Sequence, residues 1–170
     1  MLRPLPSIVV LAPVLWLFGC GADAGRGSLT GSPADDLPPH IVRLLPAGLR
    51  PDWSPDGRRL LFLDALVGDV FEIELETRAV RPLTRHFDHA GFTRARYLAN
   101  GDLLLCGPRD ADAAQPESGR WHTELWWLAA DPSGPARPLD EPCFEGPAVS
   151  RRALRIAWTR SDYPDRVVLG

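Results

Sequence analysis

Short apolar runs separated by turn residues recur along the chain from residue 40 onward. Residues 60–63 form a continuous apolar run of strand length, which is typical of a strand buried on both faces. Residues 70–75 alternate as Val-Phe-Glu-Ile-Glu-Leu, which predicts a strand with one apolar face. Pro82, in the next short strand, fits a sheet edge because proline donates no ladder hydrogen bond. No window indicates an amphipathic helix, so the pattern predicts an all-β fold.

The strands recur with a fixed spacing. Trp53 and Tyr97 lie 44 residues apart, and so do Gly57 and Gly101. Each aromatic residue precedes a short turn and an apolar strand, and Val149 opens a third such segment. Later segments match as well, because 70–75 parallels 123–128 and 81–84 parallels 137–140. Four short strands at a period of about 40–50 residues predict β-propeller blades.

The first turn carries the most specific motif of the chain. In Ser54-Pro55-Asp56-Gly57 the proline presets φ, the aspartate bonds its own backbone and the glycine takes a positive φ. With the strands that follow, this segment resembles the WD40-like (PD40) repeat of the TolB-type β-propeller. The resemblance covers 40–170 and weakens toward the C-terminus. The residues that carry the repeat signature are Trp53, Ser54, Pro55, Asp56, Gly57, Tyr97 and Gly101.

The predicted fold is a partial β-propeller, an open arc of about two and a half four-stranded antiparallel blades. We place the blades at about 47–84, 91–140 and 144–170, the last being incomplete, and interpret 40–45 as the outer strand of a preceding blade. Propellers close with about four to eight blades. We therefore expect a truncated product, and a part-ring that must associate is the alternative.

The first twenty residues predict an export signal. Arg3 is the only charge among them, and the apolar run 8–18 is too short to span a bilayer. The ending Leu-Phe-Gly-Cys20 resembles a bacterial lipobox, which implies a lipidated Cys20; an ordinary secretory signal is the alternative. Residues 21–39 are rich in Gly, Ala, Ser, Asp and Pro and predict a flexible linker.

The composition argues against several classes of function. All 19 basic residues are arginine, which excludes a lysine Schiff base, a lysine general base and a Walker lysine. The net charge of −3, without basic blocks, argues against nucleic acid as a partner. Nucleophile-elbow, zinc-protease, phosphate-loop and Cys-x-x-Cys motifs are missing from the sequence. We therefore expect no catalytic residue, no cofactor and no metal.

Two pairs of residues raise structural questions. Cys106 and Cys143 could pair in an oxidising compartment or remain as buried thiols, and their spacing in sequence does not decide between the two. Trp126 and Trp127 are neighbours in a predicted strand, so they should face opposite sides of the sheet.

Candidate binding residues lie in the loops of one rim. His86, Asp88 and His89 place two imidazoles and a carboxylate close together, which could begin a metal site or form a polar inter-blade loop. Trp121 closes the longest loop, 107–121, and is the best placed aromatic residue for ligand contact. The sequence indicates no particular small ligand.

The TolB resemblance implies protein–protein interaction in the bacterial envelope, for example in a Tol-like assembly. The predicted function is therefore that of a non-catalytic lipoprotein, anchored to a membrane by lipid, facing the periplasm or the surface, and binding an envelope protein. Two alternatives stay open. Similar propellers are accessories of prolyl-oligopeptidase-type peptidases, and a metal-dependent polysaccharide lyase-like propeller would use His86 and His89.

Overall fold

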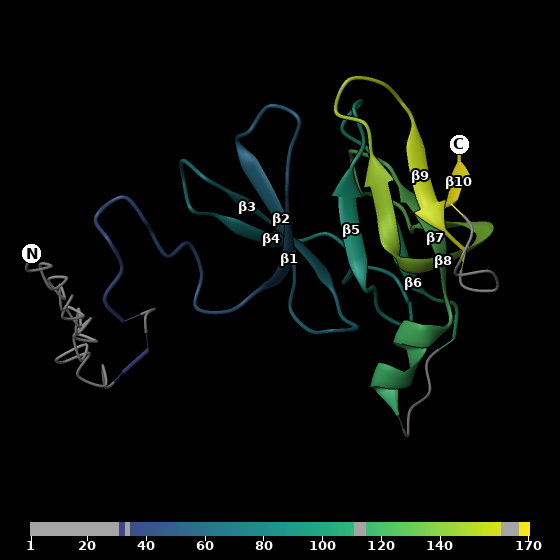
Figure 1. Ribbon diagram of the computed structural model, residues 1–170, viewed down its shortest axis with the longest axis horizontal. Coiled ribbons are helices and arrows are strands. Elements are labelled where there is room, and N and C mark those ends of the chain that lie inside the picture. The colour runs from purple at the N-terminus through teal and green to yellow at the C-terminus, as the bar shows by residue number, and fades with distance from the viewer. Residues whose placement is uncertain (1–30, 33–34, 111–114, 161–166) are drawn as a thin grey trace, which may run out of the picture. The chain divides into compact units, whose positions relative to one another are not determined.

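The computed structural model describes residues 31–32, 35–110, 115–160 and 167–170 (Figure 1). The chain divides into two compact units, Met1–Val42 and Arg43–Gly170, and the strands belong to the second. The predicted signal segment, with Cys20, lies outside the described residues. The described residues include no helix with the length and apolar character that crossing a bilayer requires.

The first sheet is a complete four-stranded blade. Its strands are β1 (Leu49–Trp53), β2 (Arg59–Leu63), β3 (Val70–Glu74) and β4 (Val80–Pro82), paired antiparallel in that order. This confirms the prediction of an antiparallel all-β blade. Residues 40–45, in contrast, form no strand, so the predicted outer strand of a preceding blade is wrong.

The turn between β1 and β2 forms for the reasons that its sequence suggests. The Ser54 hydroxyl donates a hydrogen bond to Asp56 Oδ1 at 2.6 Å and accepts one from the Arg59 backbone amide at 2.9 Å. The Arg58 amide donates to the same Asp56 oxygen at 3.0 Å, and Gly57 has a φ of +71°. The side chains therefore satisfy the backbone donors of the turn, and glycine supplies the left-handed conformation.

The second sheet contains six antiparallel strands in the order β10-β9-β8-β7-β6-β5. These strands are β5 (Arg94–Tyr97), β6 (Leu103–Pro108), β7 (Thr123–Leu128), β8 (Arg137–Val149), β9 (Ile156–Thr159) and β10 (Val167–Leu169), with a 3-10 helix η1 (Pro116–Trp121) before β7. The first part of β8 pairs with β7 and its last part pairs with β9. The second and third repeats therefore share one strand, and the predicted blade boundary near 140–144 falls inside it.

The strand registers align the three repeats residue by residue. The last residue of each inner strand pairs with the first apolar residue of the next strand: Trp53 with Leu60, Tyr97 with Leu103, and Val149 with Ile156. The repeat that the sequence spacing predicts is therefore also a repeat of hydrogen-bond register.

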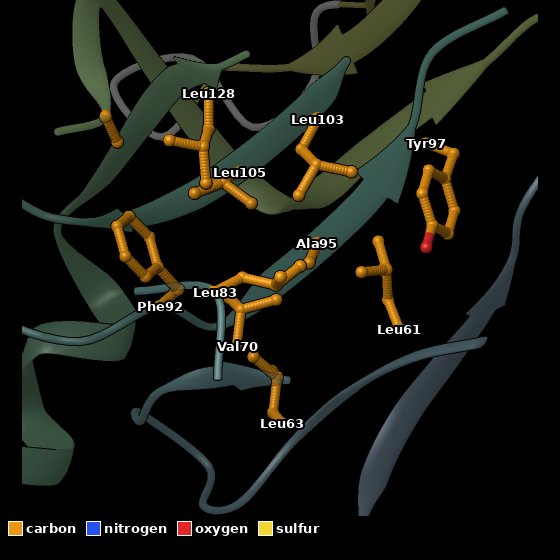
Figure 2. Close-up of a cluster of buried hydrophobic side chains, with 11 residues drawn as sticks. Leu61, Leu63, Val70, Leu83, Phe92, Ala95, Tyr97, Leu103, Leu105 and Leu128 are labelled. Atoms are coloured by element: carbon orange, nitrogen blue, oxygen red, sulfur yellow. The ribbon is translucent and has the colours of Figure 1, made fainter. Parts of the chain in front are cut away.

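Two apolar clusters lie between the three repeats and pack them together. The larger one lies between the first sheet and β5–β7, and Figure 2 shows Leu61, Leu63 and Val70 on one side of it and Tyr97 and Leu103 on the other. The smaller cluster is formed by Leu104, Cys106, Leu125, Cys143 and Trp158. Successive residues of β6 therefore enter different clusters, as expected for a strand buried on both faces. Trp126 packs on the larger cluster.

Candidate functional site

The loops 64–69 and 85–92 meet at one end of the strands. Gly68 and Phe92 exchange two backbone hydrogen bonds, of 3.0 and 2.7 Å. Arg85 lies across the same junction, with its guanidinium 3.5 Å from Asp64. The structure therefore brings together, at one rim, a loop within the first blade and the segment that connects the first two blades.

Asp69 is the centre of this junction. Its carboxylate accepts hydrogen bonds from the Thr84 hydroxyl at 2.8 Å, from Arg85 Nε at 3.2 Å and from His89 Nε2 at 3.1 Å. Burial raises the pKa of Asp69, but these donors outweigh burial and hold its pKa below the ordinary value of 3.8. The carboxylate is therefore ionised, and its hydrogen bonds hold residues 85–92, the linker between the first two blades.

His89 is fixed by bonds at both ring nitrogens. The Gly91 amide donates to Nδ1 at 2.8 Å, so the proton of the neutral ring is on Nε2, where it is donated to Asp69. The ring also packs against Phe87 and Phe92, at centroid distances of 5.2 and 4.8 Å. With neither nitrogen available, His89 positions the linker and is not placed to transfer protons to a ligand.

His86 and Asp88 are exposed, and the structure does not join them to His89 in one site. His86 Nε2 lies 3.1 Å from the Gly134 carbonyl oxygen, whereas His89 bonds to Asp69. Among the described residues there is no group of three or more His, Cys, Asp or Glu side chains that could hold a metal ion. The arrangement fits a polar inter-blade loop better than the start of a metal site.

Trp121 is presented at the surface on a braced segment. It is the last residue of η1 and is 53% exposed. The Arg120 guanidinium lies over its ring, 4.7 Å from the centroid. Earlier in η1, Gly119 packs so closely on Pro108 at the end of β6 that an added Cβ would come within 2.9 Å of the proline ring. The helix therefore rests on the sheet and presents an exposed aromatic ring with a guanidinium over it.

A buried carboxylate that the sequence analysis missed joins all three repeats. Asp52 on β1 is 3% exposed and accepts the Tyr97 amide at 2.9 Å. It also accepts a hydrogen bond from Arg96 of β5 at 3.0 Å and another from Arg151, in the turn between β8 and β9, at 2.6 Å. Asp52 and Arg96 are 44 residues apart, like Trp53 and Tyr97, so they occupy equivalent positions in the first two repeats. Their opposite charges were the signal in the sequence from which this ion pair could have been predicted.

A second buried carboxylate, Glu72, lies in the same interface. It is 4% exposed and binds Arg81 Nε at 2.8 Å, Arg59 at 3.3 Å and the Tyr97 hydroxyl. Burial raises the pKa of Tyr97, and the negative charge of Glu72 raises it further. These contacts fix how the first two blades pack, and they leave both buried carboxylates paired with donors.

The two described cysteines are free thiols in one buried cluster. Cys106 Sγ donates to Thr123 Oγ1 at 3.2 Å, and that hydroxyl donates to the Cys143 carbonyl. The neighbouring Cys106 thiol and burial raise the pKa of Cys143, which opposes formation of the reactive thiolate. Of the two alternatives, the structure contains buried thiols.

Comparisons with known proteins bear on the fold. No protein-family description matches the sequence, and no curated protein matches it. Among solved structures, TolB from Acinetobacter baumannii aligns at 19% identity and a TM-score of 0.45 over 65% of this chain and 26% of its own. A TolB candidate from Agrobacterium tumefaciens aligns at 16% identity and a TM-score of 0.52 over 72% of this chain and 45% of its own.

The β-propeller domain of the Trilobed protease from Pyrococcus furiosus aligns at 17% identity and a TM-score of 0.41, over 65% of this chain and 34% of its own. The chain thus spans less than half the length of each of these structures. The match at a TM-score of 0.52 agrees with the strand order, the register repeat and the two inter-blade clusters described above. The described residues therefore have the fold of part of a TolB-like β-propeller.

Proposed function

We propose that this protein is a non-catalytic, lipid-anchored module of the bacterial cell envelope that binds another envelope protein through one propeller rim. The observation that supports this function is the braced pair of Arg120 and Trp121 on η1. Arginine and tryptophan are the residue types that most often dominate the energy of protein–protein contacts. A rigid support lowers the entropy lost when such a pair is bound.

The chemistry of the same rim favours binding over catalysis. Both nitrogens of His89 are engaged, and the Asp69 carboxylate has three donors. The repeat signature of the TolB type, which implies protein interaction in the envelope, agrees with this reading. Under this proposal the loops form a contact surface, and the bonded side chains beneath them keep its shape.

The partner contact is tested with the substitution Trp121→Ala in the full chain. The variant and the parent are used to capture proteins from bacterial envelope extracts, and the affinity for any shared partner is then measured. A hot-spot tryptophan contributes about 2 kcal/mol or more, so we expect about a 30-fold weaker affinity. Leu154→Ala is the control, because Leu154 is 62% exposed in the turn between β8 and β9, at the other end of the strands.

Two results would contradict the binding proposal. One is equal capture by the parent and by Trp121→Ala, and the other is the failure of the parent to retain any envelope protein reproducibly. A partner lost equally in Trp121→Ala and Leu154→Ala would likewise remove the assignment of the contact to η1.

The membrane anchor is tested separately at Cys20. Under the proposal the lipid on Cys20 holds the protein on a membrane, and 21–39 is the spacer to the propeller, which faces the periplasm or the surface. Cys20→Ser should move the protein from the membrane fraction to the soluble fraction and abolish labelling by a fatty-acid analogue. Retention of the label by Cys20→Ser would refute lipidation at this residue.

A further inference from the structure

A short segment before β1, residues 44–48, lies across one face of the first blade, and we call it the strap. It lines one side of a cavity of about 340 Å³, whose other side is formed by Leu60, Phe62 and Ile73. Gly48 packs so closely on Phe62 that an added Cβ would lie 3.1 Å from Phe62 Cδ2. The strap and the sheet therefore meet at Gly48 and enclose an apolar space beside that contact.

The described residues that line this cavity have no charged or hydrogen-bonding side chain. They are Leu44, Leu45, Pro46, Ala47, Gly48, Pro51, Leu60, Leu61, Phe62 and Ile73. A charged group placed there would lose its hydration and gain no side-chain partner, which costs free energy. Apolar cavities of about 150 Å³ already bind benzene or xenon. The lining therefore suits an uncharged hydrocarbon group.

The size of the cavity fits a small molecule better than a protein. Small-molecule sites have volumes of about 300–1,000 Å³, whereas a stable protein contact buries about 800 Å² on each partner. The sheet side is largely withdrawn from solvent, because Leu60 is 8% exposed and Ile73 is 1% exposed. Phe62 is half-buried and stacks on Phe71 with a centroid distance of 5.4 Å. A narrow hydrocarbon chain can therefore lie against a rigid, partly aromatic wall.

The opposite wall is exposed to water on its outer side and is loosely attached. Pro46, Ala47 and Gly48 are exposed, so the polar end of a ligand can stay hydrated beside them. Within the described part of the chain, the strap makes no backbone hydrogen bond to the sheet, and Pro46 has no amide donor. Segments without such bonds open at a low free-energy cost. The strap can therefore move outward while the β2–β3 ladder stays paired from Arg59 to Leu63.

We propose that the cavity under the strap binds the hydrocarbon chain of a free fatty acid, with its carboxylate left in water beside Pro46–Gly48. A single chain fits because the volume lies at the lower end of the range for small-molecule sites. The site lies wholly within Arg43–Gly170 and needs neither a lipid on Cys20 nor a protein bound at Trp121. It therefore adds a ligand to the proposed envelope function without depending on it.

The test is the binding of cis-parinaric acid, a fluorescent fatty acid, to the full chain carrying Cys20→Ser. The probe is used without detergent and below the concentration at which it forms micelles. We expect saturable binding of one molecule per chain and displacement by laurate. Ala47→Phe places a ring in the cavity and should weaken binding by about 10-fold or more, as expected when at least two methylene groups lose their apolar surroundings.

Ala153→Phe is the matched control. Ala153 is also an exposed alanine, but it lies in the turn between β8 and β9 and does not line the cavity. It retains the apolar run 8–18, so any binding of the probe to that run is common to both variants. The affinity of Ala153→Phe should equal that of the parent, and urea unfolding checks that the variants are folded.

Several results would overturn this assignment. They are the absence of saturable binding by the parent, equal affinities of folded Ala47→Phe and the parent, and an equal loss in Ala153→Phe. Displacement by phosphatidylglycerol vesicles as effective as that by laurate would refute the preference for a free single chain. If Ala47→Phe does not fold, Leu44→Ala removes part of the strap wall instead, and an unchanged affinity in that variant would refute the site.

Discussion

Replacing Asp52 with alanine should destabilise the propeller repeats through a single interior site. The substitution leaves the Tyr97 amide in a buried position without an acceptor, which costs about 1–3 kcal/mol. Arg96 and Arg151 lose their carboxylate, but their side chains are 36% and 45% exposed and can be rehydrated. Each of those pairs therefore counts roughly as a surface ion pair of 0.2–1 kcal/mol. We expect a total loss of about 2–4 kcal/mol.

The loss is measured by urea unfolding of the full chain, with the slope of the transition compared between variants. With a slope of about 1–3 kcal/mol per molar urea, the midpoint should fall by roughly 1 M or more. Glu76→Ala, in the exposed turn after β3, removes a carboxylate without an interior bond and should leave the midpoint unchanged.

The position of Asp52 also predicts energetic coupling between the first and third repeats. In a double-mutant cycle, Asp52→Ala and Arg151→Ala should be non-additive by at least about 0.5 kcal/mol, because one bond joins the two side chains. A loss below about 1 kcal/mol in Asp52→Ala, or full additivity in the cycle, would refute the account of Asp52 as the residue that ties the repeats together.

Three further predictions concern Asp69, Gly107 and the two buried cysteines. Because the pKa of Asp69 is lowered in the folded state, its contribution to stability is complete above its ordinary pKa of 3.8 and is lost as the pH falls through the folded-state pKa. Asp69→Asn should therefore flatten the acid limb of unfolding free energy against pH, and an unchanged limb would contradict this. Gly107→Ala would place a Cβ 2.5 Å from a backbone carbonyl oxygen and should cost about 1–3 kcal/mol, whereas Gly134→Ala, with no atom within 4 Å, should leave the thermal midpoint in place. In a chain carrying Cys20→Ser, Cys106 and Cys143 should react with a thiol reagent only after unfolding, and rapid reaction of the native variant would show that the cluster is open.

The parts of the fold that depend on local pattern could be predicted from the sequence. The runs 60–63 and 70–75 have the composition of strands in one blade, and Ser54 to Gly57 define their turn without help from the rest of the chain. The spacing of 44 residues identified the second blade, because equivalent residues enter equivalent strands. These predictions were confirmed since each uses either local composition or a repeat period, and both can be read directly along the sequence.

The parts that depend on long-range pairing could not be predicted. Residues 141–143 contain a glutamate and a proline and have no strand pattern, yet they continue β8 because β7 pairs with them. His86 and His89 are close in sequence, but their partners are Gly134 and Asp69, from two distant loops. Sequence spacing places the imidazoles near each other and gives no information about which distant atoms they bind.

The strand shared by the second and third repeats sets an order of local opening. β9 and β10 have four and three residues, and β8 is the strand that joins them to the rest of the sheet. Amide hydrogen exchange should therefore be fastest in β10, slower in β9, and slowest in the half of β8 that pairs with β7. When β9 detaches, the second half of β8 becomes a sheet edge with free backbone donors and acceptors. A repeat boundary inside a strand thus couples the opening of β9 to the exposure of half of β8.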